Sequence, residues 1–164
     1  MTKINAAITA VGKYVPDDVL TNKELEKIVE TNDEWITTRT GIKERRILKD
    51  KDKPTSYLAI KAAEDLIQKK GLDPKEIDLV LVGTATPDMN VASTAVHVAT
   101  QIGAINAFGY DLQAACSSFL YAMSTAASYI ESGRYKKVLI IGADKMSSII
   151  DYEDRATCII FGDG

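Results

Sequence analysis

The stretch that decides the fold is Gly109-Tyr110-Asp111-Leu112-Gln113-Ala114-Ala115-Cys116-Ser117-Ser118-Phe119-Leu120. It predicts a buried strand, then a tight turn of small residues, then a long apolar helix. Cys116 lies where the strand passes into the helix, beside the free N–H groups and the positive end of the helix dipole, which both favour a thiolate. The position therefore suits a nucleophile, while the alternative is that Cys116 is a small buried apolar residue.

Segments typical of strands and helices alternate on both sides of this stretch. Apolar runs predict strands over residues 3–11, 77–83, 107–112, 137–142 and 157–161. Apolar periodicity and capping signals predict helices over residues 22–30, 55–70, 93–103 and 117–132, and a helical turn that ends at Gly41. Because strands alternate with helices, we expect an α/β domain of layered helices and a mostly parallel sheet.

The composition is that of an ordinary globular domain. The 164 residues are 46% apolar and 26% charged, and the chain is long enough to bury a core. Two cysteines, Cys116 and Cys158, do not make a disulfide framework, and the longest apolar runs are too short to span a bilayer. With no secretory signal recognised, we expect a cytoplasmic protein without a membrane partner.

The charge is unevenly distributed along the chain. The net charge is −3, which makes nucleic acid an unfavourable partner. Residues 39–53, however, hold seven basic side chains, Arg45 and Arg46 among them, against three acidic ones. This stretch is either a solvated loop or a docking patch for phosphates or for an acidic partner such as a carrier protein.

Trp35 and Arg39 are four residues apart in the helical turn that ends at Gly41, so they share one helix face. Thr31 lies four positions before Trp35, near the same edge. An indole beside a guanidinium and hydroxyl groups is able to stack on a flat ring and to hold phosphates. The alternative is a half-buried Trp that the Arg side chain covers.

His97 is the only histidine, and the sequence offers it no catalytic partners. It lies in the middle of a predicted helix, with no carboxylate or cysteine at the spacing of a triad or of a metal site. We interpret it as a structural histidine, and we expect no metal site and no phosphate-binding P-loop.

Three stretches together resemble one enzyme family. Residues 31–42, Thr-Asn-Asp-Glu-Trp-Ile-Thr-Thr-Arg-Thr-Gly-Ile, closely resemble the N-terminal signature of β-ketoacyl-[acyl-carrier-protein] synthase III. Residues 111–119, Asp-Leu-Gln-Ala-Ala-Cys-Ser-Ser-Phe, resemble its nucleophile segment, which the wider thiolase-like condensing enzymes share. Residues 155–164, Arg-Ala-Thr-Cys-Ile-Ile-Phe-Gly-Asp-Gly, resemble its third signature, so the resemblance covers essentially the whole chain.

This resemblance implies a thiolase-like fold and an acyltransferase of fatty acid biosynthesis. The fold has two similar α/β halves in a layered αβαβα arrangement, and residues 1–164 match the N-terminal half. An acyl-CoA primer would load its acyl group on Cys116, and malonyl-[acyl-carrier-protein] would then condense with it as CO₂ is lost. Coenzyme A enters as part of a substrate, so the resemblance implies no separate cofactor, and it implies a homodimer.

The resemblance also assigns residues to the binding of the primer. Trp35 would stack on the adenine of coenzyme A, with Arg155 on the other side of that ring. Arg39 and Thr31 would lie along the same nucleotide site, and Val91 falls where family members place a residue that lines the acyl pocket.

The chain departs from the family in its length. Family members are about twice as long, and their catalytic His and Asn lie in the second half, so we expect a fragment that needs a complementary C-terminal half. Two hypotheses remain: half of a condensing enzyme, or a non-catalytic piece that keeps a surface facing coenzyme A or a dimer partner. Hydroxymethylglutaryl-CoA synthase is a further alternative, against which residues 35–41 argue.

Overall fold

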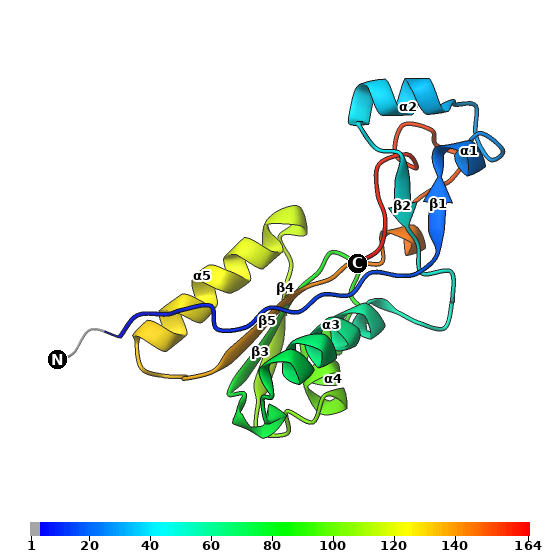
Figure 1. Cartoon of the computed structure of the whole chain (residues 1–164). Helices are drawn as coiled ribbons and strands as arrows, with labels where there is room; N and C mark the ends of the chain where they lie inside the picture. Colours follow the sequence, from blue (N-terminus) through cyan, green and yellow to red (C-terminus); the bar gives the residue numbers. More distant parts are fainter. Residues whose placement is uncertain (1–3) are drawn as a thin grey trace. The chain divides into compact units, whose positions relative to one another are not determined.

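The structure, a computed structural model, describes residues 4–164 and divides the chain into two compact units (Figure 1). Unit 1 contains the chain up to Tyr14 together with Pro54–Asp144. Unit 2 contains Val15–Lys53 together with Lys145–Gly164. Unit 2 is therefore built from two segments of the chain that are far apart in sequence.

The centre of unit 1 is a parallel sheet of three strands. β3 (Leu79–Gly83) lies between β4 (Phe108–Leu112) and β5 (Val138–Gly142), with Leu79 opposite both Phe108 and Val138. All five residues of β3 are buried, because both neighbouring positions in the sheet and both of its faces are covered. The predicted parallel sheet and its continuous apolar strand are confirmed.

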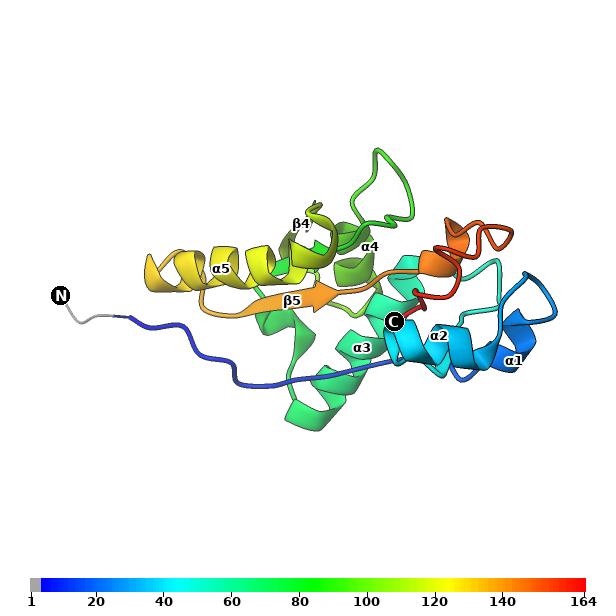
Figure 2. The ribbon, with the colours of Figure 1, turned by 90° about the horizontal axis from the view of Figure 1, so that it is seen from above.

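Helices cover both faces of this sheet (Figure 2). On one face, Ala122 and Ala126 of α5 (Ser118–Glu131) pack against Leu79 and Leu81. α3 (Thr55–Lys70) and α4 (Thr94–Gln101) lie on the other face. Unit 1 thus has three layers, as expected for an α/β domain.

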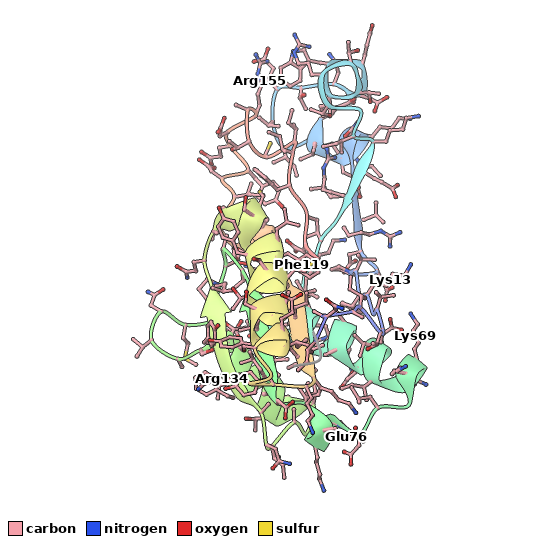
Figure 3. The ribbon with its side chains drawn as sticks, turned by 90° about the vertical axis from the view of Figure 1, so that its left-hand side faces the viewer. Lys13, Lys69, Glu76, Phe119, Arg134 and Arg155 are labelled. Atoms are coloured by element: carbon pink, nitrogen blue, oxygen red, sulfur yellow. The ribbon has the colours of Figure 1, made fainter. Side chains whose placement is uncertain are left out.

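Two glycines at the carboxyl end of the sheet let α5 begin close to it. A Cβ atom on Gly83 would lie 2.8 Å from the Cβ of Ser118, and one on Gly142 would lie 3.2 Å from the Phe119 ring. Figure 3 shows Phe119 on α5. Because α5 starts directly after the turn that holds Cys116, this close approach sets the position of that turn.

Unit 2 is organised by a short antiparallel pair, β1 (Val19–Thr21) and β2 (Glu44–Arg46). α1 (Asn22–Leu25) begins with the predicted capping box: the Glu24 N–H donates to Thr21 Oγ1, and the Thr21 N–H donates to Glu24 Oε2. α1 is shorter than the predicted helix over residues 22–30, because residues 26–29 continue as tight turns.

α2 (Asp33–Thr40) begins at an Asn32 cap and ends at Gly41, whose φ of 72° is left-handed, as the sequence predicts.

The interior of unit 2 combines a small apolar cluster with buried polar side chains. The cluster contains Leu25, Ile36, Cys158 and Ile159. Asp163 is also buried, and its carboxylate accepts hydrogen bonds from the Leu48 N–H at 2.7 Å and from the N–H and hydroxyl of Ser147 at 2.8 and 2.7 Å. This carboxylate fastens the last residues of the chain to the segment that follows β2.

Two predicted strands are wrong. Residues 4–11 form no strand, and Lys3 lies outside the described residues; Ile8 and Val11 are 72% and 73% exposed, and no strand of the described chain pairs with residues 4–11. Residues 157–161 fold into turns instead of a strand. There the Asp154 carboxylate accepts from the Ala156 N–H and the Thr157 hydroxyl, which favours a turn over an extended chain.

Among residues 4–164, no helix has the length and apolar character that a membrane crossing requires.

Candidate functional site

Cys116 lies in the turn between β4 and α5, as predicted, and its side chain is exposed and free of any disulfide. It is the middle residue of a single helical turn, Ala115–Ser117, that leads into α5. The Ala114 N–H donates to the Ser118 hydroxyl at 2.7 Å, and the Ser117 N–H donates to the Ala114 carbonyl at 3.0 Å. These bonds hold the two ends of the turn together around the thiol.

The backbone of this turn is strained at Ala115. Its φ of 47° is left-handed, and it is the only non-glycine residue of the described chain with a positive φ. A left-handed conformation costs a residue with a side chain roughly 1–2 kcal/mol. Such strain persists only where neighbouring contacts impose it, and it is common at functional sites.

The backbone N–H of Cys116 has no acceptor among residues 4–164. An unpaired N–H beside an exposed thiol is the arrangement needed to stabilise an oxyanion formed on a carbonyl that the thiol attacks. The geometry therefore fits the nucleophile interpretation of Cys116 better than the buried apolar one, because the thiol is exposed.

The loop before α4 carries Val91 and is held at both ends by carboxylates. Asp144 Oδ1 accepts from the Thr84 hydroxyl at 2.9 Å and from the Ala85 N–H at 2.7 Å. Asp111 caps α4, accepting from the N–H groups of Thr94 and Ala95, both at 2.7 Å. Neither role was predicted, although an Asp at or just beyond the carboxyl end of a parallel strand is a signal for such a contact.

Val91 is 99% exposed at the tip of this loop. It lines an open groove of about 380 Å³, and the other lining residues are Pro87, Met89, Asn90, Ala92, Ser93, Asp111 and Gln113. The structure thus places Val91 on an open surface of unit 1 and shows no enclosed acyl pocket there. Its assignment to an acyl pocket stays a prediction.

Trp35, Arg39 and Arg155 meet in unit 2 and form what we call the Trp35 clamp. The Arg39 Cζ lies 4.4 Å and the Arg155 Cζ 5.1 Å from the centre of the Trp35 ring. Arg155 also donates to the Glu30 carbonyl at 3.2 Å, from an exposed turn marked in Figure 3. An indole with two guanidinium groups close to its ring offers a stacking surface and positive charge, the two features that a nucleotide requires.

Trp35 is half-buried against the apolar cluster of unit 2, and Arg39 lies over its ring. Both interpretations from the sequence, the ligand site and the covered Trp, fit this geometry. The Arg155 guanidinium now lies directly over the Trp35 ring. The flat ring of a ligand that bound between these two side chains would therefore have to separate them.

Thr31 does not offer its hydroxyl to this site. The Thr31 Oγ1 is buried and has no hydrogen-bond partner among the described residues. A hydrogen bond between the Thr31 hydroxyl and a ligand would require that hydroxyl to become accessible.

The predicted docking role of Arg45 is wrong, because its side chain is 5% exposed and lies inside unit 2. Arg46 is exposed, but it donates to the carbonyl oxygens of Pro16 and Asp17. Successive residues of a strand point to opposite faces, so one of two adjacent arginines in β2 points inward.

The remaining nucleophilic and metal-binding residues form no second centre. Cys158 is fully buried, and burial raises the pKa of its thiol, so it is a poor nucleophile. His97 is on the exposed side of α4. No group of three His, Cys, Asp or Glu side chains in residues 4–164 is arranged to hold a metal ion.

Comparisons with known proteins agree on one family. A family model described as 3-Oxoacyl-[acyl-carrier-protein (ACP)] synthase III matches residues 110–164. The chain is 60% identical to Beta-ketoacyl-[acyl-carrier-protein] synthase III 2 of Bacteroides thetaiotaomicron and 58% identical to Beta-ketoacyl-[acyl-carrier-protein] synthase III of Porphyromonas gingivalis. Both matches cover 100% of this chain and 49% of the relative, so the chain spans about half the length of the curated relatives it matches.

Solved structures give the same result for the fold. The structure of 3-oxoacyl-[acyl-carrier-protein] synthase III from Aquifex aeolicus VF5 matches with a TM-score of 0.90 and 49% identity, over 99% of this chain and 51% of that one. The enzyme from Thermus thermophilus matches with a TM-score of 0.92 and 46% identity, over 96% of this chain and 49% of that one. The predicted thiolase-like α/β fold is confirmed.

Proposed function

We propose that this chain, which belongs by sequence and fold to the β-ketoacyl-[acyl-carrier-protein] synthase III family, loads an acyl group from coenzyme A on Cys116 to prime fatty acid synthesis. The chain fits the N-terminal half of that family. The observation that carries the proposal is the exposed Cys116 in a strained turn, next to its own unpaired N–H.

The first step is a thioester exchange. The Cys116 thiolate adds to the carbonyl carbon of the acyl-CoA, and the carbonyl electron pair moves to oxygen. The Cys116 N–H stabilises this oxyanion. When the carbonyl re-forms, the bond to the coenzyme A sulfur breaks, and the departing thiolate takes a proton from solvent. The acyl group is then held on Cys116 as a thioester.

The second step forms a carbon–carbon bond. Malonyl-[acyl-carrier-protein] loses CO₂, and the enolate carbon that results attacks the acyl thioester. Cys116 leaves as a thiolate, and the product is a 3-ketoacyl-[acyl-carrier-protein]. His97 is exposed on α4 and has no catalytic partner in the described residues. We therefore propose that the groups that promote decarboxylation lie in the half of each relative's sequence that this chain does not match.

The Trp35 clamp is the proposed site for the nucleotide of coenzyme A. The adenine would stack on Trp35, with Arg155 on its other face, and Arg39 would neutralise phosphate charge. Thr31 would join the site only after its hydroxyl became accessible, and Val91 would line the acyl pocket. Coenzyme A is a substrate here, with no separate cofactor, and we propose a homodimer that acts in the cytoplasm.

The test is acyl transfer from a radiolabelled acyl-CoA to the full-length protein. We expect label on wild type and on Cys158→Ala, which keeps the exposed thiol, and none on Cys116→Ala. Cys158→Ala is the matched control, since Cys158 is the other cysteine of the chain and is buried.

Label that persists on folded Cys116→Ala would exclude Cys116 as the acceptor, and an unlabelled wild type would favour a non-catalytic piece. CO₂ release from malonyl-[acyl-carrier-protein], measured separately, reports the second step. Label without CO₂ release would show that this protein performs only the first step.

A further inference from the structure

Arg45 lies inside unit 2 without a carboxylate among its hydrogen-bond partners. Its Nη1 donates to Asn22 Oδ1 at 2.8 Å and to the Leu20 carbonyl at 3.3 Å, and its Nη2 donates to the Ile159 carbonyl at 2.6 Å. Its Nε is buried with no acceptor in the described residues. Burial lowers the pKa of Arg45, but an arginine stays charged in proteins, so a full positive charge rests on neutral oxygens.

Such a charge is costly, since a buried ion without an opposite charge loses hydration that neutral oxygens restore only in part. Apolar residues of similar size often stabilise a fold better. The distinctive contribution of Arg45 is therefore geometric: its planar guanidinium fixes three oxygen atoms from two separate segments, residues 20–22 and Ile159, relative to one another.

The first of these segments leads to the helix of the clamp. Asn22 is 1% exposed, and its Nδ2 donates to Asp33 Oδ1 at 2.7 Å and to the Ile42 carbonyl at 2.8 Å. Asp33 is the first residue of α2, and Ile42 follows the Gly41 that ends it. Asn22 thus holds both ends of the helix that carries Trp35 and Arg39, and Arg45 holds Asn22.

The second segment leads to the other side of the clamp. The Ile159 carbonyl belongs to the run of turns that carries Arg155, four residues earlier. Cys158 and Ile159 pack beside Ile36 of α2 in the apolar cluster. A single guanidinium therefore connects the segment of Arg155 to the helix of Trp35 and Arg39.

We propose that Arg45 is the positioning residue of the Trp35 clamp, and that through Asn22 and the Ile159 carbonyl it sets the separation between Trp35 and Arg155 at which a nucleotide ring binds. The part of this inference that concerns nucleotide binding rests on the proposed function. Arg45 itself touches no substrate.

Trp35 is the only tryptophan of the 164 residues, which gives a direct spectroscopic test. In the full-length protein, the emission of Trp35 is isolated by subtracting the spectrum of Trp35→Phe. Arg45→Met removes the guanidinium, and Arg45→Lys keeps the charge but cannot reach all three oxygens. Arg46→Met is the matched control, because Arg46 is the exposed neighbour in the same strand.

Without ligand, we expect Arg45→Met to shift Trp35 emission to longer wavelength, as Arg155 and the turn around it loosen, while Arg46→Met leaves it unchanged. With coenzyme A, we expect quenching in wild type and a Kd at least about tenfold weaker in Arg45→Met. Arg45→Lys should fall between the two. Labelling of Cys116 by an acyl-pantetheine, which lacks the nucleotide, should be the same in wild type and in the three arginine variants, and this excludes a loss of structure in unit 1. An unchanged far-ultraviolet circular dichroism spectrum excludes unfolding of unit 2.

Each failure has its own signature. Unchanged Trp35 emission, or an unchanged Kd for coenzyme A in folded Arg45→Met, would overturn the positioning role. A wavelength shift in Arg45→Met, with no quenching by coenzyme A in wild type, would support the positioning role and overturn the proposed nucleotide site. If Arg45→Met does not fold, the same comparison between Arg45→Lys and wild type decides.

Discussion

Unit 1 surrounds its central strand with apolar side chains, whereas unit 2 builds much of its interior from polar ones. In unit 1, Leu79 and Leu81 of β3 are fully buried against α5. In unit 2 the strands have three residues each, and Asn22, Arg45, Lys145 and Asp163 are buried beside a small apolar cluster.

This difference matters for the two candidate sites. Apolar burial is strong but non-directional, and it supports a turn such as that of Cys116 by fixing whole elements. Hydrogen bonds are directional, and a network such as that of Arg45 fixes individual side chains. Layer packing thus positions the Cys116 turn, the candidate nucleophile, whereas polar contacts position the Trp35 clamp.

The largest loss of stability should come from the apolar layer of unit 1. Leu81→Ala removes a fully buried side chain, and we expect a loss of about 2–5 kcal/mol in the free energy of unfolding, measured with urea. Ile105→Ala is the control, since Ile105 is 70% exposed and should change little. Equal effects of both changes would mean that β3 is not the centre of the core.

The polar interior of unit 2 should be nearly as sensitive to an isosteric change. Asp163→Asn keeps the size of the side chain but removes the charge that three donors share. We expect a loss of about 3 kcal/mol in the same urea measurement. A loss no larger than that of Ile105→Ala would show that unit 2 relies on its apolar cluster alone.

A smaller change tests whether packing in unit 1 places the nucleophile. In Gly83→Ala the new Cβ would lie 2.8 Å from the Cβ of Ser118, so α5 must shift; we expect a loss of about 1–3 kcal/mol. The rate of Cys116 acylation should also fall. Gly71→Ala strains a φ of 63° without meeting any atom, so it should lower stability but leave acylation unchanged. Equal acylation rates in both variants would contradict this account.

The smallest expected effect is a pH dependence in unit 2. Burial raises the pKa of the Cys158 thiol, so the thiol stays protonated in the folded state at pH values where it ionises in the unfolded chain. The protonated Cys158 thiol makes its full contribution to the free energy of unfolding below the thiol pKa of the unfolded chain, about 8.5. As pH rises from there toward the raised pKa of the folded state, this contribution is lost by at most ~1.4 kcal/mol per pH unit. Urea titrations between pH 8 and pH 10, roughly where thiols titrate, should show this fall in wild type and in Cys116→Ala. Cys158→Ala should remove most of it, leaving only the part at about pH 10 to which Tyr152, whose pKa burial also raises, contributes.

The elements that the sequence predicts well are those that periodicity and caps define. β3, β5, α3 and α5 lie within two residues of their predicted ranges, because apolar side chains determine where they pack. The strand predicted over residues 157–161 was wrong because the Asp154 side chain competes for the local N–H and hydroxyl groups. For residues 4–11, strand propensity alone was not sufficient without a neighbouring strand.

In the candidate site, too, the features that depend on local spacing were predictable, whereas contacts between distant residues were not. The turn of Cys116 and the shared face of Trp35 and Arg39 follow from local spacing, and the structure confirms both positions. The approach of Arg155 to Trp35 joins residues far apart in the chain, so only the family resemblance indicated it. The burial of Arg45 had no local signal, because an arginine in a charged stretch is usually exposed.

The discontinuity of unit 2 has a consequence for synthesis on the ribosome. Residues 15–53 emerge first, but Cys158, Ile159 and Asp163, which complete their interior, follow only after the 91 residues of 54–144. At translation rates of 5–20 residues per second this delay lasts about 5–18 s. During that interval Leu25, Ile36 and Arg45 lack their partners, so the nascent chain exposes the future clamp. Unit 2 thus closes only after all of unit 1 has been synthesised.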